Sequence, residues 1–376
     1  EAYLELHQER LRRALAATAD DFRYVVGSCS FTADVERQPA DDHEAILLAQ
    51  VGPPSFYRTP TSSSSLGTSS LPQQSWVFGV HVSSDDYPRA AARKLSFYAQ
   101  QRQQQQQAQL VNTNQNNNLK ATLPVRIVSR TSSEFFASTC AAAAAELQGL
   151  GFQNVQQFSF DPDGDDDGNG VVNHRDERFL RTVADAACPP ETTSDNDDYR
   201  PALFLCTRTE QDVLLARWRE TGCLVTSLWL TAATWGWWYN DNLDAVLDIQ
   251  GAGQWHPQFD YSDRYFDSGV QMLETNADQV GYLGGYDMLV SYVAPMLAAQ
   301  HLQQAYRVLD VPTPAEDIQT AEGREVLRRR MLDLRVDTLF GPVQFNEYQR
   351  NNGRGSAAIQ WQPDSSSSSS SSTTDA

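Results

Sequence analysis

The 376-residue chain lacks the features that would tie it to a nucleic acid or embed it in a membrane. Its 29 Lys and Arg residues face 48 Asp and Glu residues, which gives a net charge of −19 at pH 7. Phosphate contacts need clustered basic side chains, so this charge argues against nucleic acids and against anionic membrane surfaces. No apolar run approaches the roughly 20 residues of a membrane-spanning helix. The length suggests two domains or one two-lobed unit.

Cysteine is sparse and is not spaced for metal binding. The odd number of cysteines allows at most two disulfides and a free thiol, and the sequence does not assign the pairs. No signal peptide is visible either, because Glu1 opens a stretch with helical periodicity. We therefore expect a soluble fragment, or the mature portion of a longer protein. The five cysteines, none of them in a Cys-x-x-Cys pair, are Cys29, Cys140, Cys188, Cys206 and Cys223.

The motifs of common catalytic sites are absent as well. The six histidines are scattered, and none lies in a His-Glu-x-x-His or nucleophile context. There is no Gly-x-Ser-x-Gly, Walker-type or Gly-x-Gly-x-x-Gly pattern. The sequence thus predicts a protein that is not an enzyme.

Strands and helices alternate at short spacing between tracts of low complexity. The tracts are the Ser-rich 61–70, the Gln/Asn-rich 100–118, the acidic 192–199 and the Ser-rich tail 362–376, which we expect to be insertions or disordered. The predicted strands are 22–28, 45–52, 75–82, 123–130, 155–160, 202–207 and 225–231, and the predicted helices are 1–19, 33–44, 85–101, 135–151, 177–187 and 209–221. This order predicts an α/β fold of parallel sheets flanked by helices, which bind ligands at the carboxyl ends of their strands.

A stretch from 165 to 177, DDDGNGVVNHRDE, has the register of a calcium-binding loop. Such loops need oxygen ligands at positions 1, 3, 5, 7, 9 and 12, and Gly at position 6. Gly170 occupies position 6, and strand and turn patterns precede the loop where a helix would be usual. An acidic, solvated insertion is the alternative. The predicted Ca²⁺ ligands are Asp165, Asp167, Asn169, the Val171 carbonyl, Asn173 and Asp176.

Three segments resemble the type 1 periplasmic-binding-like domains. VVGSCSFTADVERQPADDHEAILLAQVGPP is similar to the first lobe, and WVFGVHVSSDDYPRAAARKL to the segment that closes it. VDTLFGPVQFNEYQRNNGRGSAAIQWQ is similar to the terminal Thr-x-x-Gly-x-Val-x-Phe-Asp element, with Asn346 in place of the usual Asp. The superfamily includes leucine/isoleucine/valine-binding proteins and the extracellular regions of class C G-protein-coupled receptors and receptor guanylate cyclases. The resemblance covers roughly residues 1–361.

The resemblance implies two Rossmann-like lobes joined by three hinge crossovers, the Venus-flytrap arrangement. Lobe 1 would comprise 1–118 and 255–340, and lobe 2 would comprise 119–252 and 341–361. The crossovers would lie near Lys120, Ile249–Gly253 and Phe340–Gly341. Function would then be closure of the lobes around a ligand, driven by higher affinity for the closed state.

The resemblance also implies where a small-molecule ligand binds. Pro53 and Pro54 have no backbone N–H, so the first-lobe site loses two amide donors. Amino-acid-binding members hold the ligand's ammonium group with an acidic residue of the second lobe, and the matching residues 230–233 include no acid. Arg208 brings a positive charge instead, so an acidic or neutral metabolite fits as well as an amino acid. The positions that match the family's ligand site are Ser28, Ser30, Phe31, Val51 and Gly52 in lobe 1, and Phe135, Arg208 and Thr231 in lobe 2.

Three functions remain open at this point. The leading one is the extracellular ligand-binding region of a eukaryotic membrane receptor, because Gln/Asn and Ser tracts suggest a eukaryotic gene. The second is a solute-binding protein that serves an ABC-type transporter. The third is a calcium-dependent scaffold or adhesion module. The expected partners are a small molecule, a downstream membrane domain or transporter subunit and, as an open alternative, a second copy of the chain; the expected location is the extracellular face of a membrane.

Overall fold

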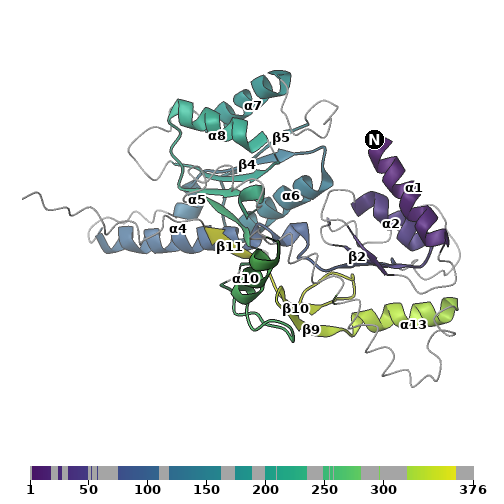
Figure 1. Cartoon of the computed structure of the whole chain (residues 1–376). Coiled ribbons are helices and arrows are strands. Elements are labelled where there is room, and N and C mark those ends of the chain that lie inside the picture. Colours follow the sequence, from purple (N-terminus) through teal and green to yellow (C-terminus); the bar gives the residue numbers. More distant parts are fainter. Residues whose placement is uncertain are drawn as a thin grey trace, which may run out of the picture. The chain divides into compact units, whose positions relative to one another are not determined.

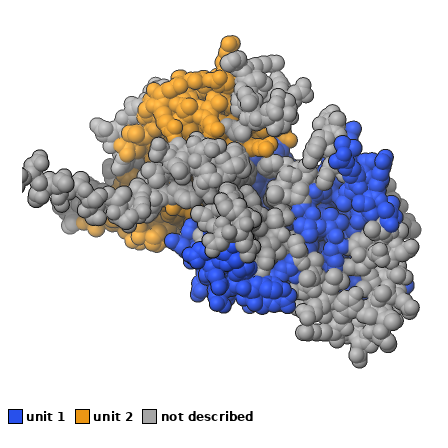
Figure 2. Space-filling view, viewed as in Figure 1, with its two compact units in different colours: residues 1–87, 133–139, 254–357 blue, residues 88–132, 140–253, 358–376 orange. Residues whose placement is uncertain are grey.

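The computed structural model describes fifteen stretches of the chain: 2–17, 24–27, 33–49, 52, 57, 75–109, 118–161, 174–188, 200–208, 210–234, 249–253, 255–256, 258–280, 296 and 320–360. These form two compact units, each assembled from separate chain segments (Figure 2). The first unit comprises 1–87, 133–139 and 254–357, and the second comprises 88–132, 140–253 and 358–376. Among the described residues, no helix is long and apolar enough to span a membrane.

The first unit contains a parallel sheet in the order β1 (Tyr24–Val26), β2 (Ile46–Ala49) and β3 (Val77–Gly79) (Figure 1). The central strand is a continuous apolar run that is buried throughout, as expected for a strand covered on both faces. Helix α1 (Ala2–Ala17) lies against helix α2 (Ala33–Asp42).

Successive side chains of β2 point to opposite faces of the sheet, so this unit has one hydrophobic core on each face. Leu47 and Ala49 pack with Ala40 of α2 on one face. Ile46 and Leu48 point to the other face and join a larger cluster. This cluster includes residues from α10 (Gly269–Val280) and α13 (Ala321–Leu332), and from the hairpin of β9 (Arg335–Thr338) and β10 (Gly341–Gln344).

The turn between β9 and β10 explains the Thr-x-x-Gly signature in the sequence. The Thr338 hydroxyl donates to the Gly341 carbonyl over 2.7 Å and accepts the Phe340 N–H over 3.0 Å. Gly341 has a φ of 97°, a conformation that favours glycine, and a Cβ there would lie 2.8 Å from the Arg354 side chain. The turn therefore needs Thr at its start and Gly at its end.

The segment that follows β10 is bonded to the first unit. Gly79 N–H donates to the Gln349 carbonyl (2.9 Å), and Asn351 N–H donates to the Gly79 carbonyl (3.0 Å), which adds a bridge beside β3. Asn346, which stands where Asp is usual, accepts the N–H groups of Tyr348 and Arg350 through its side-chain oxygen. These bonds explain why 341–357 falls in the first unit, whereas the sequence analysis expected it in the second lobe.

The second unit is built on a six-stranded sheet. Its strand order is β11–β8–β7–β6–β4–β5, and the pairs among β4 to β8 are all parallel. The strands are β4 (Val125–Arg130), β5 (Val155–Phe160), β6 (Ala202–Cys206), β7 (Ser227–Leu230), β8 (Gln250–Gly253) and β11 (Ala357–Gln360).

Helices cover both faces of this sheet. Leu203 and Leu205 of β6 pack with α7 (His174–Ala187) and α8 (Glu210–Thr221). Cys206 follows Leu205 directly, so its side chain points to the opposite face of the sheet. It forms a disulfide with Cys140 of α6 (Glu134–Gly149), so α6 covers that face (Figure 1).

The two disulfides of the described residues both lie in the second unit. Cys140–Cys206 joins α6 to β6, and Cys188–Cys223 joins the residues that follow α7 and α8. The expected limit of two disulfides is met, and Cys29 lies outside the described residues.

Residues expected to be loops take regular structure in two places. The Gln-rich tract continues α4 (Arg89–Gln109) as far as Gln109, and does not form an irregular insertion there. Gln is a good helix former, so the helix that starts in an apolar stretch extends into the tract. Residues 250–253, expected near a glycine hinge, form the buried strand β8, and the chain passes to the first unit directly after Gly253.

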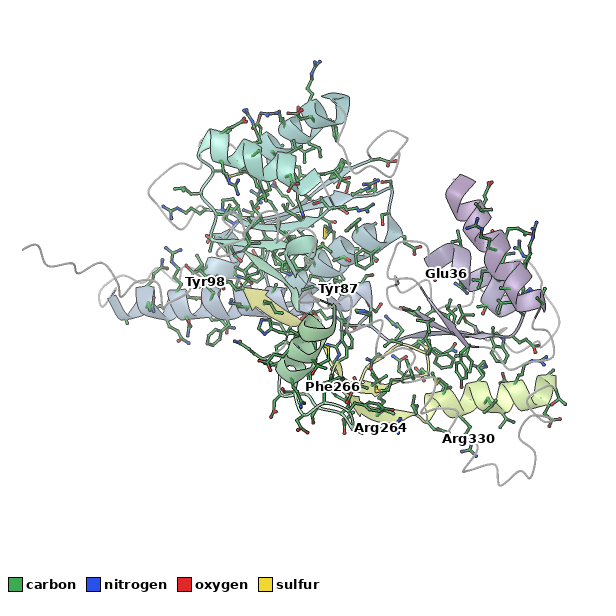
Figure 3. The ribbon with its side chains drawn as sticks, in the orientation of Figure 1. Glu36, Tyr87, Tyr98, Arg264, Phe266 and Arg330 are labelled. Carbon is green, nitrogen blue, oxygen red and sulfur yellow. A yellow bond between two sulfur atoms is a disulfide. The ribbon has the colours of Figure 1, made fainter. Side chains whose placement is uncertain are left out.

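Helix α4 belongs to the second unit, which begins at Pro88, although the sequence predicted that all of 1–118 lies in lobe 1. Arg93 donates to Glu146 of α6 over 2.9 Å, and Lys94 donates to Gln360 of β11 over 2.6 Å. Phe97 and Tyr98 are exposed on this helix. Tyr98 is labelled in Figure 3.

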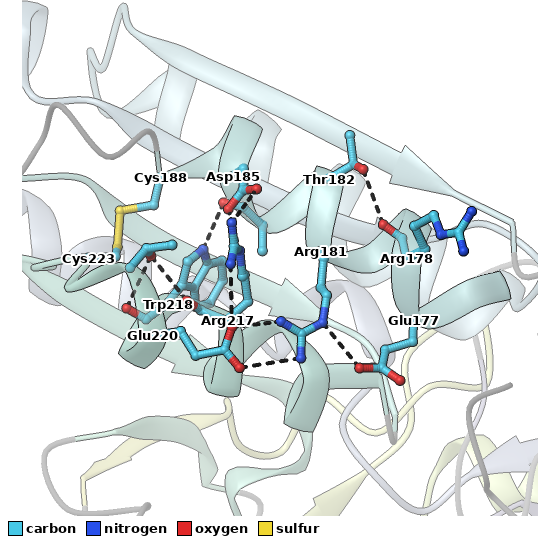
Figure 4. Close-up of polar contacts among 12 residues, drawn as sticks. Glu177, Arg178, Arg181, Thr182, Asp185, Cys188, Arg217, Trp218, Glu220 and Cys223 are labelled. Carbon is cyan, nitrogen blue, oxygen red and sulfur yellow. Dashed lines mark hydrogen bonds and ion pairs between the residues drawn. A yellow bond between two sulfur atoms is a disulfide. The ribbon is translucent and has the colours of Figure 1, made fainter. Parts of the chain in front are cut away.

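An ion-pair network links the surfaces of α7 and α8 (Figure 4). Arg217 binds both carboxylate oxygens of Asp185, at 2.7 and 2.9 Å. Arg181 binds Glu220 at 2.6 Å. Beneath the network, Trp218 is buried and donates its indole N–H to the Ala184 carbonyl over 2.8 Å. The network therefore fixes one helix against the other around a shared aromatic contact.

The stability that this network contributes should fall at acid pH. The hydrogen bond from Arg217 lowers the pKa of Asp185 below 3.8, and hydrogen bonds from Arg181 and Arg217 lower the pKa of Glu220 below 4.5. A lowered pKa in the folded state means that the contribution is complete above these ordinary values and is lost as the pH falls through the lowered ones. Arg217→Met should therefore reduce the melting temperature at pH 7, and reduce it less at pH 3.

The matched control is Arg219→Met, since Arg219 is on the same helix and makes no ion pair among the described residues. A melting-temperature loss for Arg217→Met that is equal at both pH values would contradict the electrostatic origin.

Candidate functional site

The structure describes four of the eight predicted ligand residues. Gly52 is buried, and its carbonyl accepts the N–H of Ser84 over 3.3 Å. Phe135, Arg208 and Thr231 are described below. Ser28, Ser30, Phe31 and Val51 lie outside the described residues, so their role stays a prediction.

In the first unit, a serine–aromatic cluster follows the carboxyl end of β3. The Ser84 and Ser138 hydroxyls lie 2.7 Å apart, and Ser84 is fully buried. Phe135 packs edge-on against Tyr87 and Phe136, with ring centroids 5.4 and 5.3 Å apart (Tyr87 is labelled in Figure 3). Phe135, which the sequence placed in lobe 2, belongs to the first unit, and only 5% of it is exposed. The cluster combines hydroxyl groups with aromatic edges, which is a suitable lining for a small, partly apolar molecule.

An arginine that was not predicted from the sequence lies beside this cluster. Arg350 Nη1 lies 3.2 Å from both carboxylate oxygens of Asp85 and 3.4 Å from the Ser83 hydroxyl. Burial is the main cause that raises the pKa of Tyr57, and the neighbouring Tyr87 raises it further. Arg350 acts in the opposite direction and lowers it. Arg350 reaches this position through the bridge to Gly79, a long-range pairing that no local pattern announces.

In the second unit, charged side chains meet at the carboxyl ends of β4 and β6. Arg130, the last residue of β4, binds the Glu210 carboxylate over 2.5 Å and the Ser132 hydroxyl over 2.8 Å. The other Glu210 oxygen accepts the backbone N–H of Arg208 over 2.9 Å. The side chains of Arg130 and Glu210 are 14% and 4% exposed. Glu210 therefore compensates Arg130 and orders the β6–α8 turn at the same time.

Hydroxyl and amide side chains complete this edge of the sheet. Thr231, at the end of β7, is fully buried and donates to the Leu205 carbonyl over 3.0 Å. Thr207 follows β6, and Gln211 lies in the first turn of α8; both are fully buried. Of the predicted second-lobe positions, Arg208 and Thr231 thus flank the same strand ends. The sequence did not predict a role for Thr207, Glu210 and Gln211. They differ from ordinary turn residues only in being buried, and burial is not visible in the local sequence.

The predicted calcium loop cannot be compared with these sites. Asp165, Asp167, Asn169, Val171 and Asn173 lie outside the described residues, and Asp176 lies in the first turn of α7. The described part of the chain holds no group of three or more His, Cys, Asp or Glu residues that could bind a metal ion. Calcium binding stays a prediction, which a calcium titration of the melting temperature, repeated with Asp165→Ala, would test.

Comparisons with known proteins identify the fold. No family model and no curated protein sequence matches the chain. Solved structures do match: a leucine-bound ABC transporter substrate-binding protein from Desulfitobacterium hafniense has a TM-score of 0.59 at 13% identity, over 96% of this chain and 83% of that one.

Two further structures agree. A putative branched-chain amino acid ABC transporter protein from Rhodospirillum rubrum has a TM-score of 0.59 at 14% identity, over 94% of this chain and 82% of that one. A benzoate-bound solute-binding protein from R. palustris has a TM-score of 0.57 at 9% identity, over 94% and 81%. The expected resemblance is confirmed at the level of fold: the chain has the α/β fold of the type 1 periplasmic binding proteins.

Proposed function

We propose that the chain is a non-catalytic binding protein for a small polar metabolite, of the solute-binding kind that serves a membrane transporter. The observation that carries this proposal is the gathering of buried polar side chains at strand carboxyl ends in both units, Ser84 with Ser138 in one, and Glu210 with Arg130 in the other. Open α/β sheets bind their ligands at these ends.

The transporter alternative replaces the receptor hypothesis that the sequence analysis ranked first. The structures compared above are described as transporter binding proteins, and two of them hold leucine or benzoate. They support a small organic ligand for this chain, amino-acid-like or aromatic. The receptor hypothesis rested on low-complexity tracts, which carry no information about the ligand site.

The proposed location is outside the cytosol. Cys140–Cys206 and Cys188–Cys223 are disulfides, and structural disulfides persist mainly in oxidising compartments. The partners we propose are the small molecule and a membrane subunit that receives it. Hinge closure and a homodimer stay predictions from the family resemblance, and small-angle scattering with and without a bound ligand would test both.

A ligand screen by thermal unfolding tests the proposed function. We expect at least one member of a panel to raise the melting temperature, since a ligand in hundredfold excess over Kd adds about 2.7 kcal/mol of stability. The panel contains the proteinogenic amino acids, their amides, benzoate and 4-hydroxybenzoate, each at millimolar concentration. A flat response to the whole panel would refute the proposal.

Exposed residues supply the control for this screen. Tyr98→Ala changes an exposed side chain of α4 and should leave every ligand response unaltered. Ser138→Ala, which removes one hydroxyl of the serine–aromatic cluster, should weaken the response to the ligand identified.

A further inference from the structure

In the second unit, the indole N–H of the buried Trp229 on β7 has no hydrogen-bond partner among the described residues, and two further side chains with unpartnered polar atoms lie at the turn from β6 into α8. They are the Thr207 hydroxyl and the Gln211 carboxamide, in which both Nε2 and Oε1 are unpartnered. Each residue is 0% exposed. Buried polar groups are nearly always paired in folded proteins, so each exception needs a physical reason.

Both residues lie at the turn where β6 passes into α8. Thr207 directly follows the last residue of β6, and Gln211 is the second residue of α8. Gln211 shares a stripe of the helix with Leu214, Leu215 and Trp218, which pack against the sheet. Its carboxamide therefore belongs to the buried side of α8, at the helix N-terminus and at a strand carboxyl end.

The charged neighbours of this pair are already satisfied. The Glu210 carboxylate accepts hydrogen bonds from Arg130 and from the Arg208 N–H. Arg130 is also bonded to Ser132. The turn is thus well ordered by its ionic groups, and its unpartnered polar atoms belong to two neutral side chains beside them.

We propose that Thr207 and Gln211 are specificity-determining residues of the ligand site, and that they take a neutral group that both donates and accepts hydrogen bonds, of the primary carboxamide class. This inference rests on the proposed function, and it deepens that function by naming the chemistry of the ligand's group. The remainder of the ligand binds elsewhere in the site.

The chemistry of the pair selects this class. Gln211 offers both donor and acceptor groups, which a carboxamide can match reciprocally, and the Thr207 hydroxyl can act in either sense. A carboxylate has no hydrogen to donate to the Gln211 carbonyl oxygen, which would stay unpaired. An ammonium group would leave the Gln211 Nε2 donors unpaired. A site that hydrogen-bonds its ligand rejects an analogue that leaves its polar groups unpaired.

Matched pairs of ligands test the inference on the intact chain. The probes are L-glutamine against L-glutamate, L-asparagine against L-aspartate, and benzamide against benzoate, measured by calorimetry and thermal unfolding. We expect at least one carboxamide to bind at least tenfold more tightly than its acid. If no amide binds more tightly than its acid in any of the three pairs, or if only members of the wider panel respond, the inference is overturned but the proposed function stays intact. If neither the probes nor the wider panel change the melting temperature, both the inference and the proposed function are refuted.

Variants without ligand supply a second readout. Gln211→Met and Thr207→Val remove the unpartnered polar atoms at similar volume, so each should raise the melting temperature of the free protein and abolish the preference for the amide. Gln156→Met, on the exposed strand β5, is the matched control and should change neither. A lowered melting temperature for Gln211→Met would mean that the carboxamide is satisfied in the free protein, for example by an internal water, and would overturn the inference. Retention of the amide preference in both variants would overturn it too.

Discussion

Glu210→Ala is expected to lower the free energy of unfolding by about 3 kcal/mol, the lower end of the range for breaking a buried ion pair. The variant leaves the Arg130 guanidinium without its carboxylate, at a side-chain exposure of only 14%. It also removes the acceptor of the Arg208 N–H, which orders the turn between β6 and α8. The low end applies because Arg130 keeps some contact with solvent and a hydrogen bond to Ser132.

Urea denaturation of the single variant and of a double variant measures this effect. Arg130→Met combined with Glu210→Leu removes both charges, and should recover most of the stability that Glu210→Ala loses, because no uncompensated charge remains. The control is Glu134→Ala on α6, whose side chain is exposed. A loss below about 1 kcal/mol for Glu210→Ala, the scale of an exposed pair, would show that Arg130 finds other solvation, and that the pair is not a structural requirement of the strand ends.

Removal of the Cys140–Cys206 disulfide is expected to cost a similar amount, about 4 kcal/mol. The bond closes a chain separation of 66 residues, and a cross-link of that length removes substantial entropy from the unfolded chain. The Cys140→Ala/Cys206→Ala variant also loses packing, because both residues are at most 1% exposed. We expect a lower denaturation midpoint in urea and a smaller free energy of unfolding.

The second disulfide provides the matched comparison. Cys188–Cys223 closes only 35 residues, so in the chain-entropy account the Cys188→Ala/Cys223→Ala variant should lose slightly less stability. If removing the shorter cross-link costs clearly more, the chain-entropy account fails here, and packing around α7 and α8 contributes more to stability than loop closure does. Both variants are measured against the oxidised wild type under identical conditions.

Most strands and helices up to Leu230 followed from local patterns, whereas β9, β10, β11, α10 and α13 were not predicted. Continuous apolar runs such as Ala202–Cys206 and Ile46–Ala49 are strands in the structure, and the periodic stretches around them are helices. Local composition failed where it met a long-range effect. The tract after Gln100 was taken for an insertion, yet Gln sustains the helix that precedes it. The glycine segment 250–253 pairs with β7 as a strand, and the chain passes to the first unit directly after Gly253, next to the crossover that the sequence predicted.

The candidate site was predictable only in outline. The rule for strand carboxyl ends led to Arg208 and Thr231, which do flank the ends of β6 and β7. It did not lead to Glu210 or Arg350, whose partners lie 80 and 265 residues away along the chain. Nor did it separate Thr207 and Gln211 from turn residues, since a hydroxyl and an amide have no distinctive local pattern.

By itself, the sequence determined the order of most strands and helices up to residue 231, the parallel α/β class and the family resemblance, because these depend on periodicities and motifs within short windows. Only the tertiary structure decided which cysteines pair, which charge compensates which, and which polar atoms are buried without a partner. Those features depend on the distance between residues far apart along the chain and on exclusion of water. Both properties arise when the sheets and helices pack together.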